Sequence, residues 1–240
     1  MTALVRSELL KLRTLRSTGF VLLGLLGIVG ITLIASISEA EASNTPAELR
    51  DPLLLIGYVT ALFLVAMAAN ASAGEFRHRT ISQRFLCNPA RGRVLVAKMV
   101  TYAVAGAIVA VAMVGLAIAV SDPVLVSKDL SLGLGGIELA RMAGGVVIGA
   151  VVFAILGVVV GMVSRNPTTA VVAIFGLLLA ELLIGSLIGG PTNYFPFALL
   201  QSVLGLTDHT PWGLAALILG AVTVASVVAA WRLFLWRDVT

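Results

Sequence analysis

The chain is short of charged residues and of cysteine, and both shortages restrict what it can be. Charged residues make up 12% of its 240 residues, whereas hydrophobic residues make up 59%. A soluble chain of this length cannot bury so much apolar surface in one core, and the exposed remainder would aggregate. The sequence therefore predicts an integral membrane protein.

Sites for enzymatic chemistry are also missing from the sequence. Cys87 is the only cysteine, which excludes an internal disulfide and a cysteine metal cluster. The chain contains no GxxxxGK[ST] phosphate loop, no HExxH zinc motif and no GxSxG nucleophile elbow. His78 and His209 are expected on opposite sides of the membrane. We therefore expect no catalytic residue, no metal site and no cofactor bound by this chain.

Six apolar runs are long enough to cross a bilayer, which takes about 20 residues of helix. They are expected at 17–37, 53–74, 96–120, 138–163, 168–189 and 212–236. Proline-containing pairs, among them Asp51-Pro52 and Asp122-Pro123, are expected to mark loops or helix starts between them. The predicted fold is a single all-α transmembrane domain over residues 1–240.

The basic residues predict the orientation of the spans. With the N-terminus inside, 13 of the 16 lysines and arginines are cytoplasmic. The exceptions are Arg50, Lys128 and Arg141, whereas most acidic residues of the loops fall outside. Since cytoplasmic loops carry an excess of lysine and arginine, both termini are expected in the cytoplasm, with the chain in the cytoplasmic (inner) membrane. The net charge of +4 has the same origin, so no nucleic-acid partner is expected.

Three segments differ from plain spans. Residues 1–16 have helical periodicity and predict an amphipathic helix in the membrane interface, although Glu8 and Arg16 interrupt its apolar face. Residues 75–95 form a basic cytoplasmic segment. Residues 190–211 form an outer, semi-apolar segment that is too short to span and favours a short helix.

Glu181 lies in the middle of the fifth predicted span. An ionisable group at that depth costs about 2.5–3.5 kcal/mol on insertion scales, so it should face protein or a water-filled cavity. One interpretation is a cavity-lining or proton-sensitive group. The other is a structural ion pair with Arg141 of the preceding span.

Small residues recur at helical spacing on the fourth predicted span, at Gly145, Gly149, Gly157 and Gly161. Such stripes let helices approach closely. They indicate either packing within the chain or a seam between two chains.

The cytoplasmic segment is longer than a turn between antiparallel spans needs. Residues 75–86 predict a short helix with Glu75 in its first turn, and Asn88-Pro89 would end it. Its apolar and basic residues suit a docking element. The candidate partner-docking residues are Glu75, Arg77, Thr80, Arg84, Phe85 and Leu86.

This segment resembles the coupling segment of type-2 ABC exporter membrane subunits. The family has an acid after the second span, then Arg and Thr, a Pro that ends the helix, and a basic run leading to a Lys that opens the third span. The matching residues are Glu75, Arg77, Thr80, Pro89, Arg91, Arg93 and Lys98. The N-terminal SELLKLRTLRS resembles the connecting helix of the family, and TNYFPFALLQSVL resembles its outer segment before the last span.

The resemblance implies a non-catalytic permease subunit that forms a translocation pathway as a dimer. Its partners would be two copies of an ABC-type nucleotide-binding subunit, which bind ATP and Mg²⁺, and a second six-helix membrane subunit, identical or paralogous. Membrane lipid surrounds it. The expected cargo is hydrophobic or amphipathic, such as a drug or antimicrobial peptide. The alternatives are a stand-alone secondary transporter or channel, and a scaffold that anchors a cytosolic enzyme.

Overall fold

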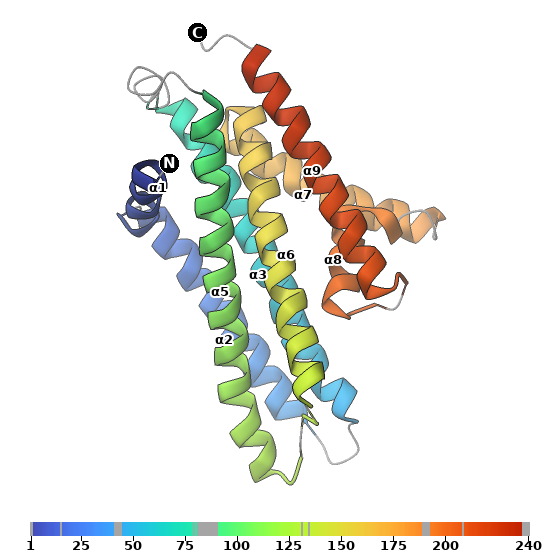
Figure 1. Ribbon diagram of the computed structural model, residues 1–240. Coiled ribbons are helices and arrows are strands. Elements are labelled where there is room, and N and C mark those ends of the chain that lie inside the picture. Colours follow the sequence, from blue (N-terminus) through green and yellow to red (C-terminus); the bar gives the residue numbers. More distant parts are fainter. Residues whose placement is uncertain are drawn as a thin grey trace.

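Figure 1 shows the computed structural model as a bundle of long helices. It describes residues 2–14, 16–40, 45–78, 80, 91–130, 132–133, 135–188, 193–207 and 209–236. The helices are α1 (Thr2–Thr14), α2 (Arg16–Glu39), α3 (Pro46–Arg77), α5 (Arg91–Ser127), α6 (Gly136–Ser164), α7 (Pro167–Ile188), α8 (Pro196–Leu204) and α9 (Trp212–Trp236).

In the described part of the chain, six of these helices are long and apolar enough to cross a membrane: α2, α3, α5, α6, α7 and α9. All six predicted spans are therefore present, and the prediction of an all-helical, multi-pass membrane protein is confirmed. The helices extend beyond the apolar runs that predicted them, since α3 has 32 residues and α5 has 37.

The prediction that Asp51-Pro52 and Asp122-Pro123 would mark breaks is wrong. Pro52 lies inside α3 and Pro123 lies inside α5. Each lies within two turns of a helix end, so the one i→i−4 hydrogen bond that a proline removes is lost near the end of the helix and not in its middle. The signals that start α3 are instead Thr45, whose side chain accepts from the backbone N–H of Glu48, and the Glu48 carboxylate, which accepts from the N–H of Thr45.

Helices α3 and α6 form the centre of the bundle and make the most extensive helix pair. In both, 56% of the apolar span is buried, against 17% in α2 and α7. Gly157 and Gly161 of α6 let the two backbones meet, because a Cβ at Gly157 would lie 2.3 Å from the carbonyl oxygen of Val65. The glycine stripe of this span therefore packs within the chain.

The other two glycines of the same stripe, Gly145 and Gly149, pack against α8. A Cβ at Gly145 would lie 2.5 Å from the carbonyl oxygen of Val203, and one at Gly149 would lie 2.5 Å from Leu200. Six of the nine residues of α8 are buried. The short helix expected in the outer segment is thus present, folded back against α6 and α9.

Two cations join helix ends at one end of the bundle. Lys128 connects the end of α5 to the end of α2, and Arg50 connects α3 to the loop before α6 and to α6 itself. Lys128 donates to the carbonyl oxygens of Ile37 (2.7 Å) and Ala40 (3.2 Å), at the end of α2. Arg50 donates to the carbonyl oxygens of Leu132 and Gly133, both at 2.6 Å, and pairs with Glu138 at 3.0 Å. At the other end of the bundle lie α1, the last turns of α9 and the start of α5 (Figure 1).

Candidate functional site

Four charged residues meet where α1, α3 and α5 come together. The Lys98 ammonium on α5 lies 3.1 Å from Oε1 of Glu75 on α3 and 3.4 Å from Oε2 of Glu8 on α1. Lys11, one turn after Glu8, donates to the same Glu75 oxygen at 2.9 Å and lies 3.9 Å from Glu8. We call these four residues the ion cluster.

The ion cluster is neutral overall and is buried on one side. The Lys98 side chain is 1% exposed, those of Glu8 and Glu75 are 4% and 10% exposed, and that of Lys11 is 39% exposed. Burying any one of these charges without an opposite charge beside it would cost several kcal/mol, and this cost would strongly disfavour the folded arrangement. The two acids and two lysines therefore depend on one another, and α1 is fixed to the bundle through them.

The position of Glu8 corrects the expected geometry of the N-terminal helix. Its face toward the bundle carries the buried Glu8 and the partly buried Leu12, whereas Leu9 and Leu10 are 40% and 54% exposed. The sequence alone predicts Glu8 as an interruption of an apolar face. It sits there because Lys98 supplies the opposite charge. Whether Leu9 and Leu10 enter a membrane interface stays a prediction.

Five of the six predicted docking residues fall into two groups. Arg77 and Thr80 are exposed, and the Thr80 hydroxyl donates to the main-chain oxygen of Glu75 at 3.3 Å. Arg84, Phe85 and Leu86 lie outside the described residues, so their docking role stays a prediction.

The sequence predicts that a separate helix begins at Glu75, and this prediction is wrong. Glu75 lies in the last turn of α3, which continues to Arg77 and is capped by His78. The helix continues because this register brings the Glu75 carboxylate against Lys98 and Lys11. Glu75 is buried, so its side chain holds helices together rather than facing a partner.

A second polar contact joins α7 to α8. The Glu181 carboxylate accepts from the backbone N–H groups of Phe197 (3.2 Å) and Ala198 (2.5 Å), in the first turn of α8. The first N–H groups of a helix have no partner within the helix, and they attract negative charge. Glu181 therefore caps α8 from a different helix.

Glu181 also lines a cavity of about 850 Å³, together with Tyr58, Gln201 and His209. Arg141, its other expected partner, lines a different pocket with Arg50 and Glu138. The structure does not bring Arg141 and Glu181 together, because the turn of α8 supplies the donors that an ion pair would have supplied. The cavity-lining interpretation of Glu181 agrees with its position.

The ion cluster was only partly visible in the sequence. The sequence indicates Glu75 and Lys98 separately, at the two ends of the basic segment, and it shows Glu8 as a charge on an apolar helix face. A charged residue out of place on an amphipathic helix signals a buried partner, but the partner's identity depends on how three helices are aligned.

In the described chain, no three His, Cys, Asp or Glu side chains lie close enough to hold a metal ion. The cluster and the α8 cap both act by joining helices. No protein-family model matches the chain, and no curated protein matches it in sequence.

Proposed function

We propose that this chain is the membrane-spanning subunit of an ATP-driven ABC exporter. Two such subunits, identical or related, form the translocation pathway in the inner membrane. Two separate ATPase subunits bind Mg²⁺ and ATP and dock on the segment that follows the buried Glu75, residues 76–90. The cargo is a hydrophobic or amphipathic molecule such as a drug or antimicrobial peptide.

The position of the ion cluster is the observation that carries this proposal. Glu75 and Lys98 are the first and last residues of the segment that resembles the coupling segment of the family. Glu8 and Lys11 belong to the segment that resembles its connecting helix. These stretches, separated in sequence, meet through contacts of 2.9–3.4 Å. Spatial convergence of independently matched segments supports the resemblance.

The same contacts supply a mechanical connection. Residues 79–90 follow α3 directly and precede α5 directly, and the cluster adds α1 to these two helices. A push on the segment would act on α1, α3 and α5 together, and α6 would follow because it packs closely against α3. Closure of the ATPase subunits would then bias the bundle between two arrangements, which is how a ligand on another chain shifts a two-state equilibrium.

The test is copurification of the chain with an ATPase subunit, followed by vanadate-sensitive ATP turnover in the complex. Phe85→Ala should weaken association by about 2 kcal/mol or more if Phe85 is an interface anchor. Arg232→Ala is the matched control, because Arg232 is an exposed residue near the end of α9. Transport without any ATPase subunit would favour a stand-alone transporter or channel. ATPase binding without ATP-dependent transport would favour a scaffold.

A further inference from the structure

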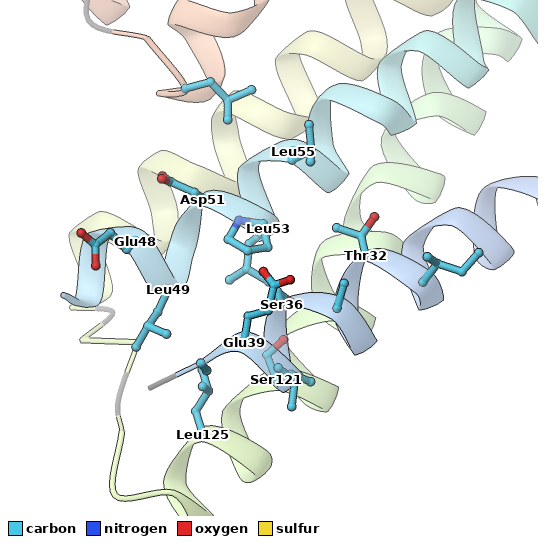
Figure 2. Close-up of a pocket in the computed structure, with 16 residues that line it drawn as sticks. Thr32, Ser36, Glu39, Glu48, Leu49, Asp51, Leu53, Leu55, Ser121 and Leu125 are labelled. Carbon is cyan, nitrogen blue, oxygen red and sulfur yellow. The ribbon is translucent and has the colours of Figure 1, made fainter. Parts of the chain in front are cut away.

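Two pockets that differ in charge lie at the end of the bundle opposite the ion cluster. The first lies between α2, α3 and α5 (Figure 2), and its charged residues are the acidic Glu39, Glu48 and Asp51. The second lies between α3, α6, α8 and the start of α9, and its charged residues are Arg50, Glu138 and Arg141. We call the second one the Arg141–Trp212 pocket, because Trp212 also lines it.

Arg141 gives the Arg141–Trp212 pocket a positive charge that the protein does not balance. It is an exposed residue in the second turn of α6, and among the described residues it makes no hydrogen bond and no ion pair. The other two charges of the pocket neutralise each other, since Nη2 of Arg50 lies 3.0 Å from Oε2 of Glu138. One uncompensated guanidinium remains, which favours an anion as the ligand.

Trp212 gives a second, independent indication of a ligand. It begins α9 and lines the same pocket, and its indole nitrogen is buried without a hydrogen-bond partner in the part of the chain that the structure describes. Water can satisfy an exposed arginine, but a buried N–H without a partner costs stability. Because an indole N–H can only donate, the partner that it lacks is an acceptor.

The position of the pocket along the helices indicates which anion is at hand. With 29 residues, α6 is about 44 Å long, whereas the hydrocarbon core of a bilayer is about 30 Å thick. Its end turns, including the one that carries Arg141, therefore reach the headgroup region, where tryptophan is also enriched. Phospholipid phosphates lie at this depth. With a volume of about 190 Å³, the pocket is below the range of about 300–1,000 Å³ for small-molecule sites and suits one polar group.

We propose that the Arg141–Trp212 pocket binds a phosphate group, either of a phospholipid headgroup or free in solution. The Arg141 guanidinium pairs with the phosphate oxygens, and the indole N–H of Trp212 donates to one of them. Leu54, Met142 and Val203, which also line the pocket, contact the apolar part of a bound lipid. The site does not depend on the exporter proposal, since it needs only the side chains of α3, α6, α8 and α9.

In the experiment, the full chain in a neutral detergent is titrated with phosphatidylglycerol, and native mass spectrometry measures the fraction of chains that carry a lipid. Arg141→Gln should lower the apparent affinity about tenfold, as expected for the loss of a hydrogen bond between charged groups. Trp212→Phe keeps an aromatic ring but removes the N–H, and it should lower the affinity about threefold or more. Because Arg141 has no partner in the described chain, Arg141→Gln should unfold at the same temperature as the parent.

Arg93→Gln and Trp231→Phe are the matched controls and should leave the affinity unchanged, because Arg93 is exposed on α5 and Trp231 packs beside Gly92, both away from the pocket. Equal losses in Arg93→Gln and Arg141→Gln would reduce the effect to general surface charge and overturn the proposal.

Diacylglycerol and inorganic phosphate separate the parts of the ligand. Diacylglycerol has the same acyl chains without the phosphate, and its binding as tightly as phosphatidylglycerol would overturn the proposal. Displacement of the lipid by excess inorganic phosphate would support a site for free phosphate. Retention of the lipid in excess phosphate, together with its loss in Arg141→Gln, would support a site for the headgroup.

Discussion

Lys98 is the residue whose burial places the strictest demand on its neighbours. Its side chain is 1% exposed, and its charge is balanced by Glu8 and Glu75, with the Tyr102 ring 6.0 Å away. The ammonium of a lysine can be buried only where such partners are already in place. This residue therefore makes the packing of α1 and α3 against α5 a condition of folding.

Lys98→Met should lower the free energy of unfolding by about 3 kcal/mol or more, because it leaves two buried carboxylates with Lys11 alone. Adding Glu8→Gln to that variant should recover part of the loss, since one uncompensated charge is removed. Equilibrium unfolding in mixed micelles measures both. Arg93→Ala, an exposed change on the same helix, should stay within about 0.5 kcal/mol of the parent. Equal effects of Lys98→Met and Arg93→Ala would show that the ion cluster does not stabilise the fold.

The Glu181 carboxylate accepts hydrogen bonds from two backbone N–H groups of α8, and a glutamine at this position cannot accept both. The amide has one acceptor oxygen, and its NH₂ group would face a second donor. In Glu181→Gln the amide hydrogens of Phe197 and Ala198 should exchange about tenfold faster, which corresponds to the loss of one charge-assisted hydrogen bond. Hydrogen exchange measured by mass spectrometry tests this. Arg141→Gln should leave these exchange rates unchanged. If Arg141→Gln raised them as much as Glu181→Gln does, the ion pair between Arg141 and Glu181 would be the contact that holds α8, and the prediction would be wrong.

The pairing of α3 with α6 depends on backbone contact rather than on large side chains. Gly157→Ala would place a methyl group 2.3 Å from the carbonyl oxygen of Val65, so one helix must move. The expected cost is about 1–3 kcal/mol, as for other overpacked cores. Gly144→Ala is the matched change on the same helix, because a Cβ there meets nothing within 4 Å. It should be neutral or stabilising by up to about 1 kcal/mol, since alanine is the better helix former. Comparing the free energies of unfolding of the two variants separates the effect of packing from the effect of helix propensity.

The helices themselves could be predicted because the signal for a membrane span is local. A run of about 20 apolar residues reports its own burial in lipid, and all six runs became helices. The ends of the helices could not be predicted equally well. A proline such as Pro52 or Pro123 ends a helix only where tertiary contacts do not stabilise the helix beyond it. The contact between Glu8 and Lys98 was beyond the sequence for a similar reason: it depends on how α1 and α5 are aligned, across 90 residues of chain.

The two ends of the bundle differ in charge, and the structure explains the residues that break the pattern. Arg50 and Lys128 are basic residues at the end predicted to lie outside, yet both are bound to main-chain oxygens, and Arg50 also pairs with Glu138. Their role there is structural. Once they are set aside, the end that carries Glu39 and Asp51 is acidic, and the end that carries Arg77, Arg93 and Arg165 is basic.

This division predicts the orientation of the protein in its membrane. Since positive charge is retained in the cytoplasm, the acidic end should face outward, and the ion cluster, α1 and the last turns of α9 should face the cytoplasm. In intact cells, a membrane-impermeant maleimide should label Asn44→Cys and Thr207→Cys variants made in a Cys87→Ser background. Native Cys87 should be labelled only after the membrane is permeabilised. Labelling of Cys87 from outside would reverse the orientation and would place residues 75–90 beyond the reach of a cytosolic ATPase, so the exporter proposal would fail with it.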